Sequence, residues 1–284
     1  MKIGISINVF DGGYGRYGEN IYSKVREQGF SAVDFSMADT NSLLYTIEQK
    51  DIQKIIIHHR QLAENAGIEV SQVHGPWRYP SKNHEIYDRN EFMEKMKKSM
   101  IFTSLLNCKN WVVHPLIPYG TDDAETDNAK RTYEINYQFM KEFIKTAKDY
   151  GITICLENMP WRKFSLAKPE NVLKLVKDIK DDNFKICLDT GHANIIPDLN
   201  LSDEVKRLGK YIKTIHVHDN FGKSDMHLMP FFGTVNFKSF AHALKDIGFS
   251  GVFSLETAPP SDLPTYIFED LSKSLCNIAE YIVK

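Results

Sequence analysis

In six short apolar stretches of this 284-residue sequence, a histidine or an acidic residue stands near the C-terminal end. Strands that are buried on both faces normally read as continuous apolar runs, so each of these polar residues breaks the expected pattern. The break recurs at the same place in every stretch, which indicates one shared cause. The residues are His74, His114, Glu157, Asp189, the pair His216 and His218, and Glu256.

Neutral imidazoles and carboxylates together are typical ligands of divalent metal ions. Carboxylates that crowd into one place repel one another, and they must either take up protons or share a cation. Since no cysteine accompanies these residues at the ends of the stretches, Mn, Co, Zn or Mg suits the set better than a metal that prefers thiolates. We therefore predict that the six stretches meet around a bound divalent metal ion.

Three further residues are candidates because of their local sequence. His192 follows Asp189 by three positions in the motif DTGH, so the turn after that stretch can bring both side chains to one ion. Asp225 and His227 form the motif SDMH in a long loop, for which a solvated loop is the simpler interpretation. The local pattern therefore supports His192 more strongly than the two loop residues.

The elements that must position these side chains alternate along the chain. Short β-rich runs are separated by longer stretches whose apolar residues recur at spacings of three and four, as in 92–106 and 137–147, and this spacing is typical of helices. Such alternation indicates a parallel sheet with helical crossovers. The eight predicted strands are 2–8, 32–37, 69–75, 110–115, 153–159, 185–190, 214–219 and 252–257.

Eight units in 284 residues give about 36 residues per unit, which lies in the range of a (β/α)8 TIM barrel. Pro169 suits the first turn of a helix, and four glycines stand where helices should end. No linker-like tract divides the chain, so we predict an α/β fold with one barrel domain over residues 1–284. The carboxyl ends of barrel strands converge on one face, where such enzymes build their active sites. The glycines are Gly29, Gly67, Gly151 and Gly248.

Composition excludes several classes of protein. Hydrophobic residues make up 42% and charged residues 25% of the chain, which is ordinary for a folded globular protein and excludes a disordered one. The 35 basic and 37 acidic residues nearly balance, so there is no overall basic field to attract nucleic acid or an anionic membrane. No apolar stretch reaches the roughly 18 residues of a membrane helix. The first residues, MKIGISINVF, suit a strand better than a signal peptide.

The four cysteines form no CxxC pair, and two of them lie in apolar strand-like runs. A reducing, cytoplasmic compartment is the simpler interpretation of this pattern. The cysteines are Cys108, Cys155, Cys187 and Cys276.

Residues 13–18 spell GxGxxG after a predicted strand, and Asp34 follows roughly 20 residues later, which resembles a dinucleotide-binding pattern. We reject this interpretation because residues 8–12 separate the strand from the first glycine of the pattern, and because it leaves the histidines and acids unexplained. We therefore expect no nucleotide cofactor. The loop is expected to form an edge of the barrel mouth, with Tyr14 and Tyr17 in reach of a substrate.

Seven motifs resemble those of the xylose isomerase-like TIM-barrel superfamily, which includes the sugar phosphate isomerases/epimerases and endonuclease IV. The resemblance extends over essentially the whole chain. DTGHAN, and HVHDN followed by DxH, are its most specific parts. The motifs are HGPW (74–77), WVVHP (111–115), CLENMP (155–160), CLDTGHAN (187–194), HVHDN (216–220), SDMHLMPFFGTVNF (224–237) and SLET (254–257).

The resemblance implies two sets of metal ligands. The epimerase-type site of four ligands corresponds to Glu157, Asp189, His216 and Glu256. Endonuclease IV has five more ligands around three zinc ions, and all five have counterparts here, so more than one ion is allowed. Because many isomerase-like members share this wider set, it does not decide between the activities. The additional candidates are His74, His114, His192, Asp225 and His227.

The expected activity is a metal-dependent isomerisation or epimerisation of a sugar or sugar phosphate. The ion would bind the carbonyl and a neighbouring hydroxyl of a ketose and hold the charge of the developing enediolate. Glu157 and Glu256 are the expected catalytic pair, one removing the α-proton and the other returning it. His192 and Trp77 are candidate substrate contacts. Arg162 could bind a phosphate or carboxylate, although a surface arginine is the simpler interpretation.

Other activities remain open at this point. An endonuclease IV-type enzyme would cleave abasic-site phosphodiesters, but the sequence lacks obvious basic loops studded with aromatic residues for gripping a bent duplex. A dehydratase would begin with the same proton removal and then expel a β-hydroxyl, and a non-catalytic sugar-binding module would leave the paired glutamates unexplained. A carbohydrate is therefore the expected partner, without nucleic acid or membrane. The superfamily resemblance also allows a homo-oligomer.

Overall fold

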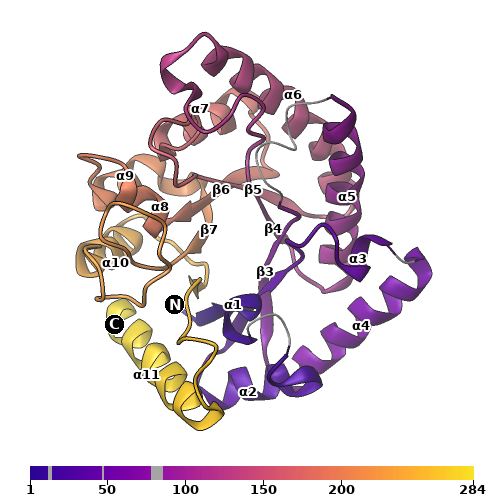
Figure 1. The fold of residues 1–284 in the computed structure, drawn as a ribbon, viewed down its shortest axis with the longest axis vertical. Coiled ribbons are helices and arrows are strands. Elements are labelled where there is room, and N and C mark those ends of the chain that lie inside the picture. Colours follow the sequence, from indigo (N-terminus) through magenta and orange to yellow (C-terminus); the bar gives the residue numbers. More distant parts are fainter. Residues whose placement is uncertain (12–14, 47, 78–85) are drawn as a thin grey trace.

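Eight parallel strands form a barrel in the computed structural model, which describes residues 1–11, 15–46, 48–77 and 86–284 (Figure 1). The strands lie side by side in chain order from β1 to β7, and β8 lies on the other side of β1. Each predicted strand is present, and each ends one to three residues earlier than predicted. The strands are β1 Ile3–Ser6, β2 Ala32–Ser36, β3 Glu69–His74, β4 Asn110–Val113, β5 Thr153–Glu157, β6 Phe184–Asp189, β7 Ile212–His216 and β8 Phe253–Leu255.

The barrel closes between β7 and β8 through the residues that follow β7. The N–H of Val217 donates to the carbonyl oxygen of Ser254 at 2.8 Å, and the N–H of Glu256 donates to the carbonyl oxygen of Val217 at 3.0 Å. The prediction of a (β/α)8 barrel is therefore confirmed.

Helices surround the sheet on its outer face (Figure 1). Gly29, Gly67 and Gly151 follow helix ends with φ values of 101°, 66° and 65°, a left-handed conformation that glycine adopts without a steric penalty. The helices are α1 Ile7–Asp11, α2 Ile21–Glu27, α3 Leu43–Thr46, α4 Gln49–Asn65, α5 Ile86–Leu105, α6 Asn128–Asp149, α7 Pro169–Ile179, α8 Thr190–Ile195, α9 Leu201–Leu208, α10 Phe237–Asp246 and α11 Thr265–Val283, with 3-10 turns η1 Gly18–Asn20, η3 Asp123–Glu125 and η4 Gly209–Tyr211.

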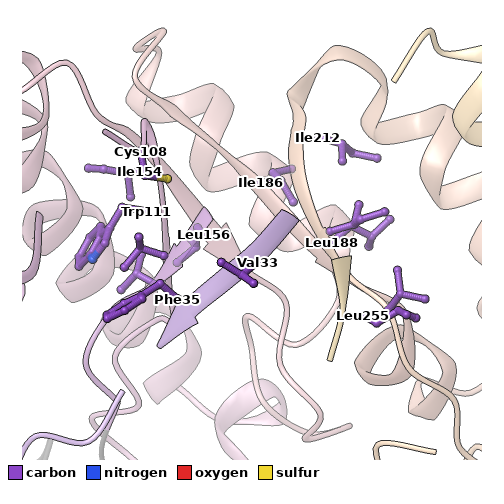
Figure 2. Close-up of a cluster of buried hydrophobic side chains, with 14 of the residues drawn as sticks. Val33, Phe35, Cys108, Trp111, Ile154, Leu156, Ile186, Leu188, Ile212 and Leu255 are labelled. Atoms are coloured by element: carbon purple, nitrogen blue, oxygen red, sulfur yellow. The ribbon is translucent and has the colours of Figure 1, made fainter. Parts of the chain in front are cut away.

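The two faces of each strand have different neighbours, because successive side chains of a strand point to opposite faces. On β5, Ile154 and Leu156 belong to the large apolar core between the sheet and the helices, part of which is shown in Figure 2. Cys155 lies with Val112 and Cys187 in a separate small cluster inside the barrel. Glu157 shares the inward face with Cys155, so the strand that buries its outer residues also carries an acid to the centre of the mouth.

The predicted glycine-rich edge is only partly described, since Gly13 and Tyr14 lie outside the described residues. β1 ends at Ser6, and α1 follows directly, so a helical turn stands between the strand and the glycines. Tyr17 stacks on Phe10 with ring centroids 5.8 Å apart. Across the described part of the chain, every helix is too short or too polar to span a bilayer.

Candidate metal centre at the mouth of the barrel

The strand-end residues gather at the carboxyl end of the barrel, as expected from the fold. β3, β5, β6 and β7 end on His74, Glu157, Asp189 and His216, while His114 and Glu256 each follow their strand by one residue. These side chains and those of the loop after β7 form three neighbouring groups of histidines and acids, in each of which the candidate ligand atoms lie within 4.8 Å of one another. A fourth group adds Cys187 to Glu157 and His216, so a cysteine does accompany the acids and histidines, contrary to expectation. The central group is Glu157, Asp189, His216 and Glu256; the inner group is His74, His114 and Glu157; the outer group is His192, His218, Asp225 and His227.

In the central group, two carboxylates approach one nitrogen. Nδ1 of His216 lies 3.1 Å from Oε1 of Glu157 and 3.2 Å from Oε2 of Glu256. The side chains of His216 and Glu157 are 0% and 1% exposed, whereas that of Glu256 is 17% exposed. Glu256 therefore faces the open side of the mouth, and Glu157 lies deep within it.

The contact at Nε2, the other ring nitrogen of His216, affects which of the two nitrogens carries the proton. Nε2 lies 2.8 Å from Oδ2 of Asp34, a carboxylate that can only accept a hydrogen bond. When a neutral His216 carries its proton on Nε2, it donates to Asp34, and the lone pair of Nδ1 then faces the two glutamates. Acceptors that face acceptors in a buried site repel one another unless a cation lies between them.

Protons are the only cations that these residues themselves can supply. Burial opposes charge on His216, but Cys187, Glu256 and Glu157 around the ring raise its pKa well above the usual value. Burial likewise opposes the ionised form of Glu157, yet His216 and His114 hold the pKa of Glu157 well below its usual range. The same attraction makes the group a suitable receptor for a metal cation.

The inner group repeats this arrangement. Nδ1–H of His74 donates to the carbonyl oxygen of Gly75 at 2.8 Å, so the lone pair of Nε2 points inward. That Nε2 lies 3.1 Å from Nε2 of His114, which in turn lies 3.2 Å from Oε2 of Glu157. Burial lowers the pKa of His114, which favours the neutral form that binds metals.

The outer group has the same chemistry on a loop. Nδ1–H of His192 donates to the carbonyl oxygen of Asn158, and Nδ1–H of His227 donates to that of Glu256, both at 2.7 Å. Their Nε2 atoms each lie 3.2 Å from Oδ2 of Asp225. The loop after β7 therefore brings Asp225 and His227 to the mouth, where their side chains stay 29% and 36% exposed.

Asp189 links the central and outer groups. It caps the N-terminus of α8, where Oδ1 accepts from the N–H of His192 at 2.6 Å. Its Oδ2 lies 3.1 Å from Nε2 of His218, whose ring stacks on that of His227 at 4.0 Å. A Cβ at Gly191 would lie 2.0 Å from the His218 ring, so only glycine allows the ring this position.

The superfamily resemblance gives no role to two residues of this environment. His218 is one of the polar residues near the strand ends, and it falls into the outer group. Asp34 entered only as part of a rejected dinucleotide pattern, although an acid between apolar neighbours in a barrel strand was a usable signal.

The predicted substrate contacts lie in different surroundings. Trp77 is partly buried, and its ring centroid lies 6.3 Å from that of His114, so it stands beside the inner group. Arg162 is exposed, and its Nη2 donates to the carbonyl oxygen of Gly222. This hydrogen bond connects the loop after β5 with the loop after β7.

Fold and site together define a (β/α)8 barrel with an acid- and histidine-lined mouth. Residues 22–275 match the family described as xylose isomerase-like TIM barrel. An uncharacterized protein of Methanocaldococcus jannaschii is 31% identical over 267 residues, which cover 90% of this chain and 83% of that protein. The chain belongs to the xylose isomerase-like TIM-barrel family.

Two proteins named as sugar 3-epimerases or as similar to them also resemble this chain. The D-psicose 3-epimerase of Agrobacterium fabrum is 23% identical over 239 residues, which cover 82% of this chain and 76% of the enzyme. The crystal structure of a D-tagatose 3-epimerase-like protein covers 100% of this chain and 98% of its own, with 28% identity and a TM-score of 0.78.

Proposed function

We propose that this protein is a divalent-metal-dependent isomerase or epimerase of a sugar or sugar phosphate. The observation that carries the proposal is the convergence of Glu157 and Glu256, from two separate strands, on the same nitrogen of His216 at 3.1 and 3.2 Å. Proton transfer next to a carbonyl needs two such groups, one to remove the proton and one to return it. The similarity to sugar epimerases supports a carbohydrate substrate.

The central group fits a divalent metal ion, because its carboxylates and the lone pair of His216 would otherwise face one another unshielded. Glu157, Asp189, His216 and Glu256 would hold the ion, for which Mn, Co, Zn or Mg is suitable. When bound, the ion supplies Lewis-acid polarisation of the substrate carbonyl.

The two glutamates then differ in their access to substrate. Glu256 is more exposed than Glu157, and its carboxylate lies beside His216. It is therefore suited to exchange a proton with a substrate that enters from the open side of the mouth. Glu157 also lies 3.2 Å from His114 and 3.5 Å from His192, so its orientation is fixed. Return of the proton to the opposite face of the same carbon gives an epimer, and return to the neighbouring carbon gives an isomer.

The remaining predicted contacts bind and enclose the substrate in this proposal. Trp77 provides a wall beside the inner group. His192 contacts a substrate hydroxyl or belongs to a second metal position with Asp225. Arg162 binds the phosphate of a phosphorylated sugar once its guanidinium releases the carbonyl oxygen of Gly222.

A second candidate activity, the cleavage of abasic-site phosphodiesters, is favoured by one observation. All nine ligands that the endonuclease IV resemblance implies fall into the three groups, and Glu157 belongs to two of them. Three ions side by side would suit phosphodiester cleavage, in which metal ions stabilise attacking and leaving oxygens. The nearly balanced charge of the chain supplies no general attraction for a nucleic acid.

One experiment separates these functions. The purified protein is analysed for metal identity and content, and is then incubated in D2O with ketohexoses, their phosphates and duplex DNA containing an abasic site. An isomerase or epimerase exchanges the α-hydrogen for deuterium and forms a new sugar, whereas a dehydratase releases a product lighter by one water. DNA cleavage without sugar turnover, or full sugar turnover after exhaustive chelation, would refute the proposal.

A further inference from the structure

We propose that Asp34 is a positioning residue of the central group, which keeps the proton of His216 on Nε2 and leaves Nδ1 as the metal-binding atom. The inference rests on the metal-dependent function proposed above and adds a residue that the resemblance leaves without a role. Asp34 lies on β2, a strand that supplies none of the candidate ligands.

The contact between Asp34 and His216 is short and shielded from water. Oδ2 of Asp34 lies 2.8 Å from Nε2 of His216, and the two side chains are 2% and 0% exposed. The glutamates approach the ring through Nδ1, so Asp34 binds the nitrogen that they do not use. This is the arrangement in which a second carboxylate fixes the tautomer and orientation of a metal-binding histidine and strengthens it as a ligand.

A neighbouring strand holds the Asp34 carboxylate in place. Nε2 of Gln72, which is 1% exposed, donates to the same Oδ2 at 2.9 Å. The pairing of β2 with β3 shifts between Val33 and Asp34, so that Val33 pairs with Val70 but Asp34 pairs with Gln72. The irregularity sets Asp34 directly opposite its hydrogen-bond donor.

A purely structural role does not explain this placement. A buried acid beside a mouth that already contains Glu157, Asp189 and Glu256 adds repulsion, which costs stability unless the acid is paired. Pairing with His216 offsets this repulsion and also fixes the orientation of the ring, because the imidazole cannot rotate or change tautomer without losing the hydrogen bond.

The test is the metal affinity of the full-length Asp34→Asn protein, measured by competition with a chelator for Mn²⁺ and for Zn²⁺. We expect binding at the central group to weaken about 10- to 100-fold, since removal of such partners has this effect on metal sites. The matched control is Asp123→Asn. Asp123 is also 2% exposed, and its carboxylate accepts a hydrogen bond from the N–H of Ser165, which lies between β5 and α7. The control is expected to lose stability while its metal affinity stays unchanged.

Two further measurements test whether Asp34 acts on metal binding through His216. The ¹⁵N spectrum of the His216 ring in the Zn²⁺-loaded protein should report a protonated Nε2 and a metal-bound Nδ1 in the native chain, and a mixture of ring states in Asp34→Asn. In a His216→Gln background, Asp34→Asn should cause no additional loss of affinity, because the residue acts through His216.

The inference is wrong if Asp34→Asn keeps native metal affinity, or if the loss persists undiminished in the His216→Gln background. Should Asp34→Asn fail to fold, Gln72→Met removes the supporting hydrogen bond instead, and it must weaken metal binding in the same direction. Native metal binding without any sugar turnover would refute the proposed function and leave the role of Asp34 intact.

Discussion

Nδ1–H of His227 donates to the backbone carbonyl oxygen of Glu256 at 2.7 Å. A residue of the loop after β7 is thereby joined to the residue that carries one of the two proposed catalytic carboxylates. The bond also turns Nε2 of His227 towards Asp225. The bond joins the outer group to the backbone of Glu256 and leaves the Glu256 carboxylate to the central group, so the two groups can be tested by separate substitutions.

Replacing His227 should remove an ion from the outer group and leave the central ion bound. We expect His227→Ala to lower the metal content by one ion per chain if the outer group is occupied, as measured by elemental analysis. His242→Ala is the control, because His242 is exposed on α10 and pairs only with Asp246 among the described residues. Equal metal contents in the two variants, with more than one ion per native chain, would contradict this assignment.

Replacing either glutamate should slow proton transfer. Glu157→Gln and Glu256→Gln each keep the size of the side chain but lose the base, so kcat should fall by about 10²- to 10⁴-fold. The rate of deuterium exchange at the α-carbon and the metal content are measured together. Because Glu157 belongs to two groups, its variant should also lose more metal. Undiminished exchange in both variants would exclude the acid–base assignment.

Removing the metal should destabilise the fold as well as abolish activity. The native state gains free energy from an ion that the unfolded chain binds weakly, about 2.7 kcal/mol when the free ion is at 100 times its Kd. For a chain of this size, the melting temperature should rise by roughly 5 °C on restoring the ion to chelated protein. A scan that is identical with and without Mn²⁺ or Zn²⁺ would argue against a bound ion.

Stability of the metal-free protein should fall as the pH rises. Burial opposes charge on His192 and His227, but acidic neighbours, Asp189 and Asp225 for the first ring and Asp225 and Glu256 for the second, raise the pKa of each from 6.5 to about 10. A raised pKa stabilises the fold fully below about pH 6.5, and this contribution is lost as the pH rises through about 10.

Metal binding should change this pH dependence. An ion displaces the protons from these rings, so its affinity should increase with pH, and the metal-loaded protein should not lose stability between pH 7 and 10 in the same way. Thermal unfolding of both forms across this range provides the comparison. A metal-free protein that is equally stable at pH 7 and pH 10 would contradict the proposed protonation of the outer group.

Most of the fold and the candidate ligands at the strand ends could be predicted because both are local patterns. The runs around Val112 and Leu156 are short and apolar and end in His114 and Glu157, which any parallel strand of a barrel would bring to the mouth. The loop residues Asp225 and His227 could not be assigned in this way. Their place depends on how the chain folds back over the mouth, for which the residues around them give no periodic signal.

By itself, the sequence determined the eightfold alternation of strand and helix and the types of side chain that stand at the strand ends, because hydrophobic periodicity is set by neighbours a few residues apart. Only the tertiary structure decided how the candidate ligands divide into groups and that Asp34 meets His216, which lies 182 residues further along the chain. Contacts of this kind arise from barrel closure and from the direction of each ring nitrogen, and neither leaves a trace in local spacing.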